Sequence, residues 1–353
     1  MPKCLIVKTS SLGDVLHTLP AITEAKKHCP DMQFDWVVER AFAEIPAWHL
    51  TVDRVIVLEI RKWRKNPFKF RREIREFYKT LKAVKYDYVI DAQGLLKSAW
   101  VTRKARGVKY GFDSHSARER WASWFYRHKI AVEPGKHAIW RTRMLFGAVF
   151  NYRPDDKILD YGIKYDWQKI AQHADYVVFL HATTWVSKFW PLDHWVELSQ
   201  LFKTHYPKLQ ILLPWGNETE LVKAKAIAGS RENITVLDSC SLTQLAETFS
   251  HSKLVISVDT GLAHLAAACN TPILSLYGPT SAKLTGSMGV NAHHLSSSLT
   301  CSPCFKRVCP ITKDAFAPCQ VSLTPTMVFK KMQQLFPPLR DMESGTRGRV
   351  DPG

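Results

Sequence analysis

Short apolar runs alternate with amphipathic stretches along most of this chain, and this alternation constrains its fold more than any other feature. In the first half the apolar runs lie at residues 4–7, 34–38, 54–58 and 88–90. Amphipathic stretches such as 21–28 and 70–82 separate them. Strands that alternate with helices predict parallel pairing through right-handed crossovers. The first helix contains Pro20, which we expect either to kink it or to occupy its first turn after Thr18.

A second alternating series begins near residue 176. Its apolar runs lie at 176–180, 209–215, 233–238, 253–258 and 272–278. Periodicity is lost between the two series, in "NYRPDDKILDYGIKYD", and 353 residues suit two domains better than one. We therefore predict an α/β protein with two Rossmann-like, doubly wound parallel-sheet domains, at residues 1–160 and 161–322.

The chain is strongly basic. It carries 49 Lys and Arg against 32 Asp and Glu, a net charge of +17 with a pI near 9.5. Such an excess favours an anionic partner: a nucleic acid, an acidic membrane surface, or a substrate rich in phosphate and carboxylate. Apolar runs stay well short of the roughly 18 residues of a membrane span, and Lys8 interrupts the first run too early for a signal peptide. We expect a cytoplasmic protein.

Three strand ends in the second half carry small, hydroxyl or charged residues. "SVDTGLAHLAAA" places Asp259, Thr260 and Gly261 between a strand and a helix. "LHATTWVSKFWP" follows the first strand of this half with two threonines and a lysine, and "LPWGNETE" follows the second with Trp215, Gly216 and Glu220. Parallel sheets bind ligands at this edge, where helix N-termini offer N–H groups to anions. We predict a nucleotide-diphosphate site, with Thr183, Thr184 and Lys188 on the diphosphate.

The first half offers a carboxylate and many cations. In "KTSSLGDVLHTLP", Asp14 stands where a phosphate-binding loop would avoid negative charge, and helix capping is its ordinary explanation. Residues 61–75 hold eight basic side chains against one Glu, with aromatics between them. "ARERW" and "WRTR" add Arg118 and Arg120, and Arg141 and Arg143. "IDAQGLLKSA" forms a further strand-to-helix edge. These features predict an anionic acceptor bound to the first domain.

Four of the eight cysteines are bunched as C-x2-C-x4-C-x9-C, at Cys301, Cys304, Cys309 and Cys319. The spacing is compatible with tetrahedral zinc, but a separate second C-x2-C pair is missing. A proline-rich loop of reduced thiols is the alternative that we favour.

These stretches together resemble glycosyltransferase family 9. The resemblance runs in order through "KTSSLGDVLHTLPA", "FDWVVE", "IRKWRK", "YDYVIDAQGLLKSA", "HATTWVSKFWP", "LLPWGNETE" and "SVDTGLAHLAAA", as far as about Thr280. It implies a GT-B fold, in which the two Rossmann-like domains face a central cleft. It also implies a C-terminal helix, here 323–338, that crosses back to the first domain. The polar tail at 339–353 is predicted to be disordered.

The resemblance implies an inverting, metal-independent transfer of heptose from ADP-heptose to the 3-deoxy-manno-octulosonic acid (Kdo) of Kdo-lipid A, with no cofactor. Asp14 matches the general base. The positions that match donor-binding residues are Thr183, Thr184, Lys188, Glu220, Cys240, Asp259, Thr260, Gly261 and His264, and Lys188 also offsets charge on the departing ADP. Those that fall near the acceptor's carboxylates and phosphates are Arg61, Lys62, Arg64, Lys65, Arg120, Arg141 and Arg143. Peripheral contact with the cytoplasmic face of the inner membrane follows from such an acceptor.

The sequence leaves other functions open. "CSPCFKRVCP" resembles a loop of the family members that add heptose to heptose, and this is the nearest alternative. A basic RNA-binding module is the default interpretation of +17, but RNA-recognition and zinc-knuckle patterns are not evident. A nicotinamide-dependent oxidoreductase lacks its glycine fingerprint.

Overall fold

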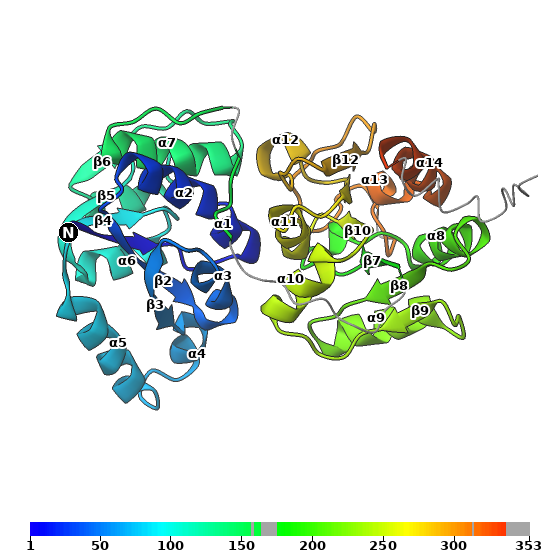
Figure 1. Cartoon of the computed structure of the whole chain (residues 1–353), viewed down its shortest axis with the longest axis horizontal. Helices are drawn as coiled ribbons and strands as arrows, with labels where there is room; N and C mark the ends of the chain where they lie inside the picture. The colour runs from blue at the N-terminus through cyan, green and yellow to red at the C-terminus, as the bar shows by residue number, and fades with distance from the viewer. Residues whose placement is uncertain (157–158, 164–174, 313, 337–353) are drawn as a thin grey trace, which may run out of the picture. The chain divides into compact units, whose positions relative to one another are not determined.

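The computed structural model describes residues 1–156, 159–163, 175–312 and 314–336. The chain forms two compact units, Met1–Asp166 and Trp167–Gly353, which are described separately below (Figure 1). The predicted boundary between residues 160 and 161 stays a prediction. In the described ranges, no helix combines the length and apolarity needed to cross a membrane.

The first unit is built on a six-stranded sheet in the order β3-β2-β1-β4-β5-β6, with every neighbouring pair parallel. The strands are β1 (Lys3–Val7), β2 (Gln33–Glu39), β3 (Val52–Leu58), β4 (Lys85–Asp91), β5 (Arg106–Phe112) and β6 (His128–Ile130). The helical elements are α1 (Leu12–Leu16), α2 (Leu19–His28), η1 (Arg40–Phe42), α3 (Glu44–Ala47), α4 (Ile60–Lys65), α5 (Arg71–Ala83), α6 (Leu96–Lys104), η2 (Arg120–Phe125) and α7 (Ala138–Phe150).

The second unit repeats this plan, with a parallel sheet in the order β12-β11-β10-β7-β8-β9. Its strands are β7 (Tyr176–Leu180), β8 (Gln210–Leu213), β9 (Ile234–Val236), β10 (Leu254–Val258), β11 (Ile273–Tyr277) and β12 (Ala292–Ser296). The helical elements are η3 (Val186–Lys188), α8 (Leu192–His205), α9 (Glu218–Ala228), α10 (Leu242–Ser250), α11 (Gly261–Ala268), α12 (Ala282–Thr285), α13 (Pro318–Val321) and α14 (Pro325–Leu335).

The predicted α/β class and the two doubly wound sheets are confirmed. Central strands are continuous apolar runs because helices cover both faces of a parallel sheet, and β7, β10 and β11 are buried at every residue. Pro20 lies in the first turn of α2 behind Thr18 as N-cap. Ser241 caps α10 through a reciprocal pair of hydrogen bonds with Gln244.

The C-terminal helix α14 packs within the second unit. Phe329 contacts the rings of Phe202 and Tyr206, and Val328 and Met332 are buried in the same apolar core. The predicted return of this helix to the first domain stays a prediction. Residues 337–353, which include its predicted end and the predicted tail, lie outside the described residues.

Candidate active site

The first candidate site lies at the switch point of the first sheet. The chain runs outward from β1 through β2 to β3 and then returns to β4 on the other side of β1. At such a point two neighbouring crossovers diverge and leave a crevice beyond the strand ends, where α/β proteins bind ligands. Lys8 and Asp14 follow β1, and Gln93 follows β4.

Asp14 is the third residue of the short helix α1 and forms a capping box with Ser11, the N-cap, which is the ordinary explanation for its place in the sequence. Both the backbone N–H and the hydroxyl of Ser11 donate to Asp14 Oδ2, each at 3.2 Å. Capping alone leaves a carboxylate open to solvent, however, and this one is not open: only 12% of the Asp14 side chain is exposed.

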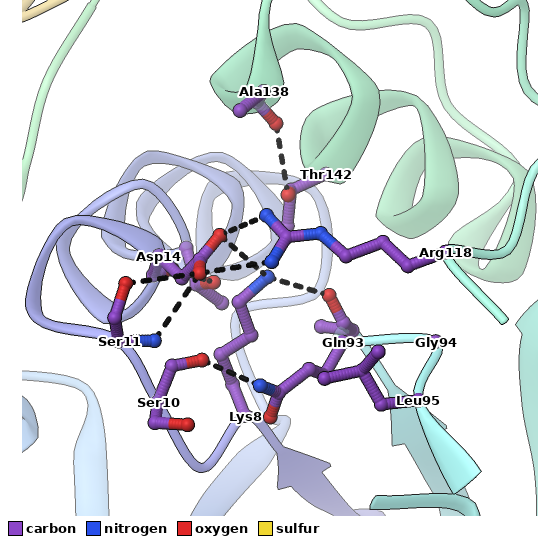
Figure 2. A network of polar contacts seen from close by, with 12 residues as sticks. Lys8, Ser10, Ser11, Asp14, Gln93, Gly94, Leu95, Arg118, Ala138 and Thr142 are labelled. Carbon is purple, nitrogen blue, oxygen red and sulfur yellow. Dashed lines mark hydrogen bonds and ion pairs between the residues drawn. The ribbon is translucent and has the colours of Figure 1, made fainter. Parts of the chain in front are cut away.

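Two cations hold the other side of the Asp14 carboxylate (Figure 2). The Arg118 guanidinium binds it with both terminal nitrogens, at 3.1 Å from Oδ2 for Nη1 and in a short contact with Oδ1 for Nη2. Lys8 Nζ lies 3.9 Å from Oδ1 and donates to the carbonyl of Ala92 at 2.8 Å. Asp14 is thus the shared anion of a buried lysine and a half-exposed arginine.

These charges set the protonation states. Burial by itself raises the pKa of Asp14, but the charges of Lys8 and Arg118 outweigh it and hold this pKa well below its usual range. Burial lowers the pKa of Lys8 to about 8, although the Asp14 charge acts in the opposite direction. Near neutral pH the site therefore contains one carboxylate and two cations.

A pocket opens beside Asp14, and a third cation, Arg141, lines it. Its polar lining comes from α1, from the segments that follow β1, β4 and β5, and from α7: Lys8, Asp14, His17, Gln93, Ser116, Arg118, Arg141 and Thr142. Three cations against one carboxylate suit an anionic ligand that is small enough to enter. The sequence interpretation included Arg141 but missed Lys8 and the pairing of Arg118 with Asp14.

Buried hydrogen bonds fix the loops around this cavity. Gln93 Oε1 accepts from the N–H and hydroxyl of Thr9, at 2.8 and 2.7 Å, and its amide nitrogen donates to Ser10. The backbone N–H groups of Gln93 and Gly94 donate to the buried Asp91. The β1 and β4 loops are thereby locked together, so Asp14 stands on a rigid support.

The predicted acceptor residues fall into two groups. Arg61, Arg64 and Lys65 are exposed on α4, where Lys62 pairs with Glu73 at 2.9 Å and with Glu59 at 3.5 Å. The N-terminus of α4 is tied to the sheet edge, because the N–H groups of Ile60 and Arg61 donate to Glu39 at the end of β2. Arg141 belongs to the Asp14 cavity and donates to the Ser116 carbonyl, and Arg120 is exposed at the start of η2.

Arg143, also predicted to bind the acceptor, is instead engaged inside the first unit. Its guanidinium forms two hydrogen bonds of 3.0 Å to Glu24 and a third to the Asp155 carbonyl, and its side chain is 6% exposed. These contacts join α7 to α2 and give Arg143 a structural role.

Arg143→Met is therefore expected to lower the free energy of unfolding by about 3–5 kcal/mol, because it leaves Glu24, whose side chain is only 12% exposed, without its cation. Urea unfolding measures this loss, and steady-state kinetics on the folded fraction should give an unchanged KM for the acceptor. An increased KM at unchanged stability would return Arg143 to the acceptor site. Exchanging both partners, in Arg143→Met with Glu24→Gln, should recover much of the lost stability.

The second candidate site lies at the corresponding switch point of the other sheet, where β7 and β10 are neighbours. Asp259 follows β10, and its carboxylate accepts from Thr280 Oγ1 at 2.5 Å and pairs with Lys188 Nζ at 2.6 Å. Thr183, which follows β7, donates to the Asp259 carbonyl at 3.0 Å. The structure thus brings together three predicted donor residues from loops distant in sequence.

The other predicted donor residues surround the same sheet edge. Thr260 is the N-cap of α11, and Gly261 is the first residue of that helix. The first N–H groups of α11 receive no hydrogen bond from a capping side chain, and His264 is buried one turn further along the helix. Glu220 accepts from the Gly216 N–H at 2.8 Å in the loop after β8. Thr184 is exposed, and Cys240 donates to the Asp238 carbonyl at 3.2 Å.

The four bunched cysteines line one apolar pocket, next to Ser187 and Pro279. All four are free thiols. Among the described residues, no group of three or more His, Cys, Asp or Glu side chains is arranged to hold a metal ion. The cysteine loop instead supports the donor edge, because the Ser187 hydroxyl donates to the Lys306 carbonyl at 2.6 Å.

Comparison with known proteins agrees with this architecture. Residues 74–314 match the model of glycosyltransferase family 9 (heptosyltransferase). The chain is 48% identical over 313 residues to lipopolysaccharide heptosyltransferase 1 of Pseudomonas aeruginosa, covering 87% of each protein. It is 46% identical over 301 residues to the protein of that name from Escherichia coli K12, covering 82% of this chain and 92% of that one.

Among solved structures, E. coli heptosyltransferase WaaC with ADP superposes with a TM-score of 0.84 at 41% identity, covering 94% of this chain and 99% of that one. The GT-B type expected for the two Rossmann-like units is confirmed by this match. Family model, sequence identity and fold lead to one conclusion: the chain belongs to glycosyltransferase family 9, the heptosyltransferases.

Proposed function

We propose that this heptosyltransferase moves L-glycero-D-manno-heptose from ADP-heptose to the Kdo of Kdo-lipid A in lipopolysaccharide inner-core biosynthesis. The observation that supports this proposal most strongly is the setting of Asp14. Its carboxylate is held between Lys8 and Arg118 beside a pocket that Arg141 also lines. This arrangement supplies a base next to cations that suit an acidic sugar. Relatives at 46–48% identity that are named lipopolysaccharide heptosyltransferase 1 support the same function.

In the proposed acceptor site, the carboxylate of the acceptor sugar replaces the Asp14 carboxylate as the ion-pair partner of the cations. As long as Arg118 and Lys8 hold Asp14, its low pKa makes it a weak proton acceptor. An acceptor carboxylate that pairs with Arg118 and Arg141 withdraws positive charge from Asp14. The pKa of Asp14 then rises, and the base becomes effective when the acceptor is bound.

In the proposed donor half, Lys188 and the N-terminus of α11 receive the diphosphate. Lys188 Nζ is paired with Asp259, which directly precedes the N-cap of α11, and its ammonium also lies 4.5 Å from the centre of the Trp185 ring. Thr183, Thr184 and Thr260 supply hydroxyls, Glu220 the ribose contact, and Cys240 and His264 the nucleoside surroundings. A solved E. coli WaaC structure with ADP-2-deoxy-2-fluoro heptose, matching with a TM-score of 0.81 at 41% identity, supports the donor.

The proposed reaction is a single displacement that inverts the anomeric centre. The acceptor hydroxyl oxygen bonds to the anomeric carbon while the bond from that carbon to the ADP oxygen breaks. The hydroxyl proton passes to Asp14, and ADP leaves with the bonding electron pair, its new charge offset by Lys188.

Arg118→Gln is expected to raise the acceptor KM by roughly ten- to a hundredfold, the value of a charge-assisted hydrogen bond. It should also change the pH profile. Arg118 lowers the pKa of Asp14, so removing Arg118 raises that pKa. As the pH is lowered, the variant should therefore lose activity at a higher pH than the wild type does. Rate measurements across pH test both effects. The exposed Arg127 provides the control variant Arg127→Gln, and identical profiles in both variants would contradict this role.

An ADP-release assay tests the whole function. Purified protein with ADP-heptose should release ADP with Kdo-lipid A and not with an acceptor that already carries the first heptose. The reverse preference would establish the heptose-adding alternative, which has less support, since E. coli heptosyltransferase II is 18% identical to this chain and shows the fold alone. We also propose that the enzyme works at the cytoplasmic face of the inner membrane, where the +17 charge favours anionic lipid.

A further inference from the structure

Three tryptophans are exposed on two elements of the first unit that pack on each other, α6 and η2. Trp100 on α6 is 45% exposed, and Trp121 and Trp124 on η2 are 46% and 70% exposed. Single exposed apolar residues are common on soluble proteins, but a contiguous group of large aromatics marks an interaction surface. We call Leu96, Trp100, Trp121 and Trp124 the tryptophan face.

The local structure presents these side chains on one rigid platform. Leu96, Trp100, Arg103 and Lys104 recur at the spacing of one face of α6, and Trp121 and Trp124 are three residues apart in a 3₁₀ helix, where such positions align. The helix and the 3₁₀ turn pack on each other over a small core of Ala99, Ala122 and Tyr126. The Trp121 and Trp124 rings meet edge to face, with centroids 4.4 Å apart.

Cations frame the tryptophan face. Lys104 Nζ lies 4.9 Å from the Trp100 ring centre, and the Arg103 guanidinium lies 5.7 Å from it. Arg120 stacks over Trp121 at 4.8 Å. In the segments 96–104 and 118–129 the one acidic residue is Glu119, whose carboxylate is engaged by the Leu96 N–H at 2.6 Å. The framed surface is therefore strongly positive.

Amphipathic rings surrounded by Lys and Arg are the composition of surfaces that lie in the headgroup layer of an anionic membrane. Single-stranded nucleic acid also combines charge with ring stacking, but stacking needs open ring faces. Here Lys104 and Arg120 cover faces of Trp100 and Trp121, and the Trp121 and Trp124 planes are 71° apart. The arrangement favours lipid over bases.

We infer that the tryptophan face is the surface through which this protein binds an anionic phospholipid bilayer. The inference rests on the proposed function in one respect: a lipid-linked acceptor gives the enzyme a reason to lie on a membrane. Insertion of the indole rings at headgroup level supplies the apolar part of the binding, and Arg103 and Lys104 supply the electrostatic part.

Vesicle flotation with the full chain tests this surface without any substrate. The wild type should float with phosphatidylcholine vesicles that contain phosphatidylglycerol, and far less with phosphatidylcholine alone. Arg103→Gln with Lys104→Gln should weaken binding roughly thirtyfold, about fivefold for each charge removed near the surface. Trp121→Ser with Trp124→Ser should weaken it about tenfold. Lys203→Gln with Lys208→Gln, two exposed charges of the second unit, should bind like the wild type.

Other outcomes overturn the inference. A wild type that ignores anionic vesicles excludes a bilayer as the partner, and face variants that float as well as the control pair place the contact elsewhere. Tighter binding of single-stranded RNA than of vesicles, lost in the same variants, would make this a nucleic-acid surface. If the tryptophan variant fails to fold, the charge pair still decides. Transfer of heptose to an acyl-free Kdo acceptor should be unchanged in all variants. If the wild type lacks this activity but still floats with anionic vesicles, the proposed function is wrong while the membrane-binding surface is supported.

Discussion

Asp14→Asn is expected to lower the turnover number about 10²- to 10⁴-fold, the contribution of a positioned general base, while ADP affinity stays unchanged. Asn keeps the shape of Asp14 and can still accept the hydrogen bonds from Ser11 that cap α1, but it cannot take a proton. Kinetics with saturating substrates measure the loss, and calorimetric titration of ADP checks the donor half.

Asp53→Asn is the matched control for this variant. Asp53 accepts a backbone N–H from Phe34 in the same unit but lies outside the Asp14 cavity. Comparable turnover in the two variants would leave Asp14 with its capping and ion-pair roles alone.

Stability against pH separates those roles further. The folded pKa of Asp14 is depressed, so its ion pairs stabilise the protein above the unfolded pKa near 4, and this contribution is lost as the pH falls. The stability gap between wild type and Asp14→Asn should therefore narrow on acidification.

Lys188→Met is expected to have two separable effects. Removing the ammonium leaves Asp259 buried beside Thr280 without its 2.6 Å partner, which should cost about 3–5 kcal/mol of unfolding free energy. It also removes the cation proposed to offset charge on departing ADP, which should lower the turnover number about 10²- to 10³-fold.

The double variant Lys188→Met with Asp259→Asn distinguishes the two effects. A neutral Asn no longer needs a cation and can still accept from Thr280, so denaturant unfolding should show most of the stability restored. Turnover should stay low, because the diphosphate still lacks its lysine. Recovery of both quantities together would mean that Lys188 serves the fold and not the chemistry.

The sequence predicts the interior of each sheet better than its margins. Central strands are buried on both faces and appear as unbroken apolar runs, as in β7 and β10. The edge strands β6, "HKI", and β12, "AHHLS", were not predicted, because they are short and only partly buried. The inner strand β5 was also missed, since "RGVKYGF" mixes charge and glycine with few buried residues.

The same contrast holds for the first candidate site. Asp14 stands out locally as a carboxylate in a strand-to-helix loop, and the family resemblance gives it a role. Arg118, its main partner, is 104 residues away and reaches it only because β4 and β5 extend the sheet beside β1. Lys8 was identifiable in principle, since it follows β1 directly, but its pairing depends on how α1 turns back over the strand end.

The placement of α14 has a consequence for synthesis of the protein. The described buried core of the first unit ends at Tyr161, so that unit can fold while later codons are still being translated. The core of the second unit is different: Phe329 and Met332 fill it against α8, some 130 residues upstream. The proposed donor site thus rests on a core that is completed only after α14 has been translated, and a ribosome that stalls before Pro325 leaves α8 with an uncovered apolar face.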